Sequence, residues 1–246
     1  LRRSLSPWNL LVPLKAVVSM IQAWSHLRDL RPLVVIGTGG YVSGPVLLAA
    51  SMMGIPTLIH EQNSIPGETT KFLAKRVSEV HVSFEETLRH LPPAANGFLS
   101  GNPTRDILQK AGRDEAMKFF GMDPRDVRKV LLVSGGSLGA RSVNNAVLEN
   151  IGRILGMGFR VVWQAGQADH DRIAAATRQF SRADVWTGAF IDRMEYAYAA
   201  ADLVLSRAGA TTIAELTRLG KPALLVPYPL AAAGHQTRNA RAMEQA

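Results

Sequence analysis

Two glycine-rich turns are the first features of this sequence that could do chemistry. Residues 37–40 (GTGG) and 135–139 (GGSLG) each follow an apolar run typical of a strand and precede a run typical of a helix. Such a turn lets backbone N–H groups approach a phosphate, and the N-terminus of the next helix adds a favourable dipole. Ser137 adds a hydroxyl donor to the second turn. One turn alone is equally consistent with a tight connection that binds nothing, but two favour a ligand.

A carboxylate and an amide provide chemistry suited to a sugar. In the run SRAGATTIAE at 206–215, a strand ends, small residues turn, and a helix begins that holds Glu215. A carboxylate there would oppose a phosphate, but it can accept hydrogen bonds from both ribose hydroxyls. The alternative is an ordinary acid near a helix N-terminus, favoured by the dipole. Gln236 offers a donor and an acceptor for sugar hydroxyls, or is a solvated loop residue.

Several other ligand classes have weaker support. Val42 stands where a dinucleotide fingerprint needs its third glycine, and the chain has no P-loop signature. Glu61 ends a predicted strand about where a ribose-binding acid would lie, so a nicotinamide enzyme stays an alternative. The run at 169–171 (DHD) superficially resembles a metal-binding Asp-x-Asp, but capping of a helix by Asp169 is the favoured interpretation. We therefore expect no metal.

The elements that must position these residues alternate between strand and helix. The sequence predicts a first set at 33–36 (strand), 45–53 (helix), 57–59 (strand), 67–76 (helix) and 77–82 (strand), and the pattern restarts at 129–133. This alternation is typical of a parallel, doubly wound sheet. Two similar halves, joined near 101–125, explain so many strands better than one sheet does. We expect the active site in the cleft between the halves.

Charge is unevenly placed along the chain. The formal net charge of the 246 residues is +8, and the first 31 residues carry five basic residues against Asp29 alone, a local excess of +4. Residues 9–28 form a predicted amphipathic helix whose apolar positions are Leu10, Leu14, Val17, Ile21 and Trp24. Basic charge concentrated beside apolar residues favours an anionic membrane surface over nucleic acid, although packing of one helical face is the alternative.

Composition excludes further classes. With no Cys, the chain has no disulfide scaffold, thiolate zinc site or Cys nucleophile. The longest apolar stretch, 46–59, contains Ser, Gly and Pro and is too short to span a bilayer. Because the chain begins with Leu1 and stops inside a helical-looking run, we expect it to be a fragment.

Six motifs in order resemble the MurG family, the UDP-N-acetylglucosamine:N-acetylmuramyl-(pentapeptide) pyrophosphoryl-undecaprenol N-acetylglucosaminyltransferases of bacterial cell-wall synthesis. They are GTGGYVSGP (37–45), HEQN (60–63), GNPTR (101–105), GGSLGA (135–140), SRAGATTIAE (206–215) and HQTRNA (235–240). Each motif is weak by itself, but the ordered set is specific and covers nearly the whole chain.

This resemblance implies an α/β protein of two Rossmann-like domains facing across a cleft, the GT-B glycosyltransferase architecture. Residues 1–104 would form an acceptor- and membrane-facing domain, which we expect to be incomplete because the family's first glycine loop precedes the region covered here. Residues 105–246 would form the UDP-sugar donor domain, without the family's final segment. The protein would act peripherally on the cytoplasmic face of the bacterial inner membrane.

The resemblance also implies a reaction and a set of site residues. N-acetylglucosamine would move from UDP to the 4-hydroxyl of the muramyl sugar on lipid I, with inversion and without a cofactor. Glu61 is the candidate base, although a structural acid that positions Asn63 is the alternative. Ser137 would face the diphosphate, Ile191 the uracil through its backbone, Glu215 the ribose and Gln236 the sugar. The full donor set is Asn63, Arg105, Ser137, Ile191, Ala210, Thr211, Thr212, Ile213, Ala214, Glu215 and Gln236.

Two other functions stay open. A UDP-N-acetylglucosamine 2-epimerase uses a similar double fold but would not need a basic membrane-facing helix. A non-catalytic subunit that binds a sugar nucleotide and recruits a partner is the third possibility.

Overall fold

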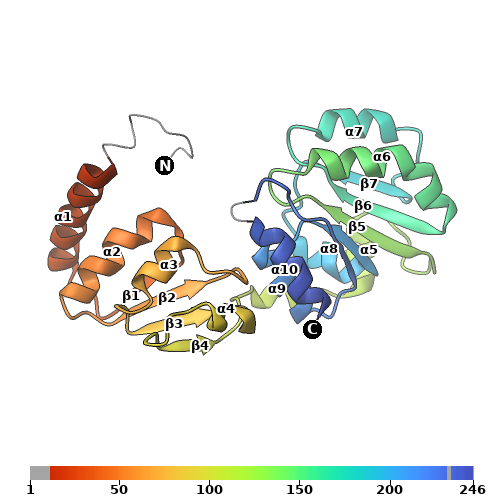
Figure 1. Cartoon of the computed structure of the whole chain (residues 1–246). Helices are drawn as coiled ribbons and strands as arrows, with labels where there is room; N and C mark the ends of the chain where they lie inside the picture. Colours follow the sequence, from red (N-terminus) through yellow and green to blue (C-terminus); the bar gives the residue numbers. More distant parts are fainter. Residues whose placement is uncertain (1–11, 232–233, 246) are drawn as a thin grey trace. The chain divides into compact units, whose positions relative to one another are not determined.

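The computed structural model describes residues 12–231 and 234–245 (Figure 1). The chain divides into two compact units, one ending at Asn102 and the other beginning at Pro103. Each unit contains one parallel sheet with helices packed on it, as the alternation in the sequence predicts. In the part of the chain that is described, no helix is long and apolar enough to cross a membrane.

The first unit has a four-stranded sheet in the order β1-β2-β3-β4. Its strands are β1 (Val35–Gly37), β2 (Thr57–Glu61), β3 (Glu79–Val82) and β4 (Gly97–Leu99), and its helices are α1 (Val12–Leu30), α2 (Gly40–Met52), α3 (Glu68–Leu73) and α4 (Glu85–Arg89). Strand residues Ile59, Val80 and Val82 pack with Leu47 of α2 and Leu73 of α3 to form its main core.

The second unit has a five-stranded sheet in the order β7-β6-β5-β8-β9. The strands are β5 (Lys129–Ser134), β6 (Phe159–Gln164), β7 (Val185–Gly188), β8 (Leu203–Ser206) and β9 (Ala223–Leu225). The helical elements are η2 (Asp106–Gln109), α5 (Arg113–Phe119), α6 (Arg141–Gly156), α7 (His170–Thr177), α8 (Met194–Ala200), α9 (Ala210–Arg218) and α10 (His235–Glu244).

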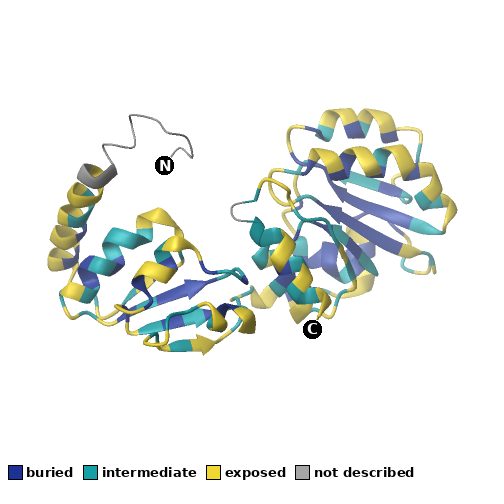
Figure 2. Ribbon diagram, in the orientation of Figure 1, coloured by how far each residue is buried: buried dark blue, intermediate teal, exposed yellow. Residues whose placement is uncertain are grey.

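Both faces of this second sheet are buried. Val130 and Leu132 of β5 join a core with α5 and α8, whereas Leu131 and Val133 join a separate core with α6 and α7. Successive strand residues point to opposite faces, so this division shows that helices cover both sides. Figure 2 shows the resulting layer of buried strands between exposed helix surfaces.

The structure adds to the sequence expectations at three places. The helix expected over 45–53 begins at Gly40, inside the first glycine turn, and has Pro45 inside it. The segment at 101–125, where the halves were expected to join, contains the boundary between the two units together with η2 and α5. Leu108 of η2, Ala116 of α5 and Phe120 are buried in the core of the second unit, so most of the expected joint belongs to that unit. The sequence analysis also missed α4 and β4.

The long first helix packs on a different face from the predicted stripe. Ala23 and Leu27 are buried against α2, whereas Val17 is 56% and Ile21 65% exposed. Trp24 is also exposed, and the predicted stripe members Leu10 and Leu14 have no described side chains. The apolar stripe therefore lies on the outside of the unit, where core packing does not explain it.

Candidate functional site

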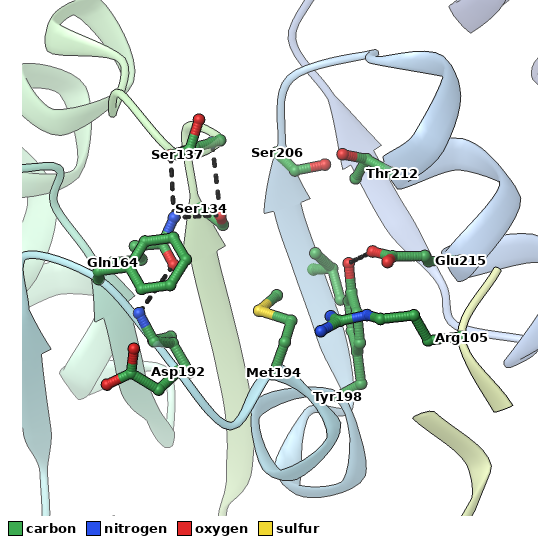
Figure 3. Close-up of a pocket in the computed structure, with 14 residues that line it drawn as sticks. Arg105, Ser134, Ser137, Gln164, Asp192, Met194, Tyr198, Ser206, Thr212 and Glu215 are labelled. Atoms are coloured by element: carbon green, nitrogen blue, oxygen red, sulfur yellow. Dashed lines mark hydrogen bonds between the residues drawn. The ribbon is translucent and has the colours of Figure 1, made fainter. Parts of the chain in front are cut away.

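The second unit contains a cavity of about 200 Å³ at the carboxyl ends of its strands. Parallel sheets place their ligand sites at this edge, because the loops and helix N-termini that follow the strands converge there. Figure 3 shows side chains from several loops and helices facing this space. The lining residues are Arg105, Ser134, Gly136, Ser137, Gln164, Phe190, Ile191, Asp192, Met194, Tyr198, Val204, Ser206, Thr212 and Glu215.

Three polar residues end neighbouring strands beside the cavity. Ser134 of β5 is in register with Gln164 of β6 on one side and with Ser206 of β8 on the other. The Gln164 amide donates to the carbonyl oxygen of Gly136 (2.9 Å), and its Oε1 accepts from the backbone N–H of Ile191 (3.1 Å). Gln164 therefore links the glycine turn to the Ile191 loop.

Close backbone packing explains the glycines of the second turn. A Cβ at Gly135 would lie 2.3 Å from the backbone nitrogen of Ala140, and one at Gly139 would lie 2.4 Å from the carbonyl oxygen of Ala165. Gly139 also has a φ of +76°, which disfavours other residues. The turn leads into α6, whose N-terminus has no side-chain cap, and Ser137 is exposed. Such a turn can offer unpaired N–H groups to an anion.

Glu215 lies across the cavity from the glycine turn and has one hydrogen bond with the part of the chain that is described. Its Oε2 accepts from the hydroxyl of Tyr198 at 2.8 Å, and Figure 3 shows this pair with Arg105 alongside. Burial of Tyr198, reinforced by the Glu215 carboxylate, raises the pKa of the phenol far above its ordinary value. The Tyr198 hydroxyl therefore keeps its proton at any physiological pH and acts as a donor to Glu215.

The cavity brings together five of the predicted donor residues, namely Arg105, Ser137, Ile191, Thr212 and Glu215. Arg105 directly precedes η2, Ser137 is in the glycine turn, and Ile191 is in the loop before α8. The other two residues are on α9. Their convergence depends on three separate strand ends meeting at one edge of the sheet. These residues stay a predicted ligand set, now with a common location.

The remaining predicted donor residues lie elsewhere. Ala210, Thr211 and Ala214 are on α9 outside the cavity lining, and Ile213 is buried in the packing of that helix. Gln236, in the first turn of α10, accepts a hydrogen bond from the backbone N–H of Tyr228 at 2.8 Å through its Oε1. Its side-chain amide nitrogen makes no hydrogen bond with the described residues.

Asn63 and Glu61 belong to the first unit, where Glu61 organises its own loop. Glu61 is 4% exposed and accepts from the backbone N–H of Asn63 (3.1 Å), the backbone N–H of Gly67 (2.9 Å) and the hydroxyl of Thr70 (2.8 Å). The Asn63 side-chain amide is a further donor at 3.3 Å. This geometry supports the structural alternative, and the role of Glu61 as a base stays a prediction.

Asp169 does not cap its helix through its side chain as expected. It stands at the N-cap position of α7 without a side-chain cap hydrogen bond. Its carboxylate instead accepts from Asn144 at 2.9 Å, and Asn144 also donates to the carbonyl oxygen of Ala165 at 2.8 Å. Asp169 therefore supports the loop that packs against the second glycine turn.

Sequence reasoning missed several lining residues that a simple rule would have found. Ser134, Gln164 and Ser206 are each the last residue of a parallel strand in the structure, and the strand end is where ligand sites form. Tyr198 offered no such signal, because it lies among apolar residues in the middle of a short helix.

The first unit contains a second cavity, which is apolar and about 500 Å³ in volume. It lies among α1, α2 and α3, next to the exposed stripe of α1. Its lining residues are Ala16, Val17, Met20, Tyr41, Gly44, Pro45, Leu48, Glu68, Thr69 and Phe72. Tyr41 and Phe72 are themselves exposed, so an apolar surface surrounds the opening.

Comparisons with known proteins agree with the motifs. Residues 1–82 match the glycosyltransferase family 28 N-terminal domain, and residues 130–246 match the family 28 C-terminal domain. The chain is 49% identical over 228 residues to the UDP-N-acetylglucosamine--N-acetylmuramyl-(pentapeptide) pyrophosphoryl-undecaprenol N-acetylglucosamine transferase of Chlorobaculum parvum, covering 93% of this chain and 61% of that protein. The identically named protein of Parabacteroides distasonis is 41% identical, with 96% and 64% covered. The chain thus spans somewhat more than 60% of these relatives.

Solved structures extend the agreement to the fold. The crystal structure of Acinetobacter baumannii MurG matches with a TM-score of 0.72 and 31% identity, covering 95% of this chain and 63% of that one. A UDP-GlcNAc 2-epimerase from Neisseria meningitidis matches with a TM-score of 0.61 at 16% identity, which shows a shared fold alone. The predicted α/β architecture of two Rossmann-like domains is confirmed. Motifs, family models and relatives together show that the chain belongs to the MurG family within glycosyltransferase family 28.

Proposed function

We propose that the protein is an inverting hexosyltransferase that moves N-acetylglucosamine from UDP-N-acetylglucosamine to the 4-hydroxyl of the muramyl sugar of lipid I, giving lipid II for peptidoglycan synthesis. One observation carries the proposal: the glycine turn with Ser137 and the carboxylate of Glu215 line the same cavity. Family membership supports the same substrates, because the relatives are named for this transfer.

The nucleotide would lie across the strand ends of the second unit. The N–H groups of the glycine turn and the N-terminus of α6 would meet the diphosphate and the charge that grows on it as the sugar leaves. The Glu215 carboxylate would accept the two ribose hydroxyls. Since Gln164 already accepts the N–H of Ile191, a backbone contact from Ile191 to uracil would use its carbonyl oxygen. Gln236 would offer its amide to the sugar, and we expect no metal or other cofactor.

The lipid-linked acceptor would bind through the first unit. The exposed stripe of Val17, Ile21 and Trp24, together with the apolar cavity beside it, supports docking of this unit onto the cytoplasmic face of the inner membrane. Exposed Lys15 and Arg28 on the same helix add attraction to anionic lipid. Binding to anionic vesicles should weaken as salt rises. Salt-insensitive binding would contradict this part of the proposal.

The acceptor hydroxyl must lose a proton as the glycosidic bond forms. Glu61 is the proposed base within this chain, and the competing role is to hold Asn63 and the loop that follows. The variant Glu61→Gln distinguishes the two roles. If Glu61 is the base, transfer is lost while UDP binding and the fold are retained. If it only positions the loop, transfer falls in proportion to the loss of folded protein.

An assay of the protein with UDP-N-acetylglucosamine and a lipid I analogue tests the proposed reaction. We expect a β-linked disaccharide on the lipid and an equal amount of UDP. Release of a 2-epimer of the sugar would instead support an epimerase, and nucleotide binding without either product would support a binding subunit. Either of those results would overturn the proposal.

Glu115→Gln, which changes an acid outside the cavity, is the matched control for Glu61→Gln.

A further inference from the structure

Glu215 depends on one neighbour for its orientation. Its Oε2 accepts the hydroxyl of Tyr198, and Oε1 has no hydrogen bond among the described residues. A glutamate in solution samples many rotamers, and fixing one costs side-chain conformational entropy. A donor that fixes the carboxylate before the ligand arrives removes part of this cost from binding.

Tyr198 is well built for this task. It is 2% exposed, and its ring is part of the core that includes Leu132, Val204 and Leu216. A ring packed this tightly cannot swing, so the position of its hydroxyl is set by the core. The phenol is a donor at all relevant pH values, because its pKa is raised by burial and by the carboxylate.

Tyr198 and Glu215 belong to two different helices that border the site. Tyr198 comes from α8 and Glu215 from α9, and both line the cavity with Arg105 (Figure 3). The hydrogen bond therefore joins the Ile191 side of the cavity, which leads into α8, to the helix that holds the carboxylate. Rotation of Glu215 away from the cavity would leave the buried Tyr198 hydroxyl without its acceptor, which is unfavourable.

We infer that Tyr198 is a positioning residue that sets the preference of this site for a ribonucleotide over a 2′-deoxyribonucleotide, by holding Glu215 in the orientation that accepts a vicinal diol. This inference rests on the proposed nucleotide site. A diol presents two hydroxyls at a fixed separation, so it rewards an oriented carboxylate. A deoxyribose has one hydroxyl there and gains less from the orientation.

The test compares the affinities of the chain for UDP and for 2′-deoxy-UDP by calorimetry. We expect the unmodified chain to prefer UDP about tenfold or more. Tyr198→Phe removes only the hydroxyl, so the affinity for UDP should fall about tenfold while that for 2′-deoxy-UDP changes little. The ratio of the two affinities should therefore collapse toward one.

Tyr196→Phe is the matched control. Tyr196 lies on the same helix, is also buried, and also donates its hydroxyl to a glutamate, Glu115, but neither residue lines the cavity. It should leave the UDP to 2′-deoxy-UDP ratio unchanged. Thermal unfolding of both variants measures any cost to the fold. If Tyr198 has a purely structural role, Tyr198→Phe should weaken the binding of both nucleotides equally and leave the ratio of their affinities unchanged. That result would overturn the inference.

Glu215→Ala separates this inference from the proposed function. If the unmodified chain does not discriminate between the two nucleotides, or Glu215→Ala retains the discrimination, the ribose assignment itself fails. If Glu215→Ala abolishes discrimination but Tyr198→Phe retains it, only the positioning role of Tyr198 fails.

Discussion

The two units contain carboxylates in similar places with opposite surroundings. Glu61 ends a strand of the first sheet, is buried, and has four donors from the loop and the helix α3 that follow it. Glu215 lies in a helix that follows a strand of the second sheet, lines a cavity, and has one donor among the described residues. A carboxylate whose acceptor positions are filled by its own chain holds a loop, and one with an open oxygen can bind a ligand. The difference cannot be deduced from residue type.

The glycine turns differ in the same way. In the second unit, Gly135 and Gly139 leave no room for a side chain, because backbone atoms lie where a Cβ would stand. In the first unit, a Cβ at Gly40 would meet nothing within 4 Å, and one at Gly39 only Gln62 at 3.9 Å. Backbone atoms thus crowd the second turn at these two glycines. In the first turn a Cβ at Gly37 would meet the Leu47 side chain at 2.4 Å, and Gly39 and Gly40 need glycine for their positive φ angles.

The largest expected effect tests whether Glu61 holds its loop. Glu61→Ala removes the acceptor of the buried Thr70 hydroxyl and of two backbone N–H groups, so the free energy of unfolding of the first unit should fall by about 3–5 kcal/mol. Hydrogen exchange of residues 61–70 in a urea series measures it. The control Glu68→Ala removes an exposed acid paired with Lys71 and should cost less than about 1 kcal/mol. Equal losses would remove the contrast between the two carboxylates.

The next effect compares the glycine turns directly. Gly139→Ala places a Cβ against the carbonyl oxygen of Ala165 at a positive φ, so it should destabilise the second unit by about 2–4 kcal/mol. Gly40→Ala has the same backbone penalty without the clash and should cost the first unit about 1–2 kcal/mol. Urea unfolding of each variant supplies the comparison. If Gly40→Ala lowers the free energy of unfolding as much as Gly139→Ala does, the proposed difference between the two turns is wrong.

A smaller loss of stability is expected at low pH. It should arise from a carboxylate of the second unit that lies outside the cavity. A hydrogen bond from Arg128 lowers the pKa of Asp126 to about 2 from its ordinary value of 3.8. Because the pKa is lowered in the folded state, the stabilisation is fully present above about pH 4 and is lost as the pH falls toward 2. The urea midpoint should decline over this range, and less steeply in Asp126→Asn. Identical slopes would show that this pair does not contribute.

Much of the fold could be predicted because the strands are locally distinctive. The sequence predicted a strand at 129–133, and β5 covers Lys129–Ser134, since this apolar run leads into the second glycine turn. The segment containing α5 was missed because its seven residues are mostly charged, and it forms a helix through the burial of Ala116 and Met117. Packing of distant residues decides such short helices, and propensity alone does not.

The candidate site was predicted in part for a similar reason. Ser137 and Glu215 stand in turns and helix starts with a recognisable chemistry, and both line the cavity. Tyr198 and Gln164 act by joining elements that are distant in sequence, and no local pattern shows such a connection. Only the tertiary structure places the Tyr198 hydroxyl beside Glu215.

Calorimetric titration of the chain with UDP, before and after Glu215→Ala, tests the central claim most directly. If the carboxylate of Glu215 accepts both ribose hydroxyls, the variant should lose about 100-fold or more in affinity, because it forfeits two charge-assisted hydrogen bonds worth roughly 1.5–3 kcal/mol each. The variant should still fold, at a cost of about 1–3 kcal/mol for the buried Tyr198 hydroxyl that loses its acceptor. An unchanged affinity for UDP would contradict the account.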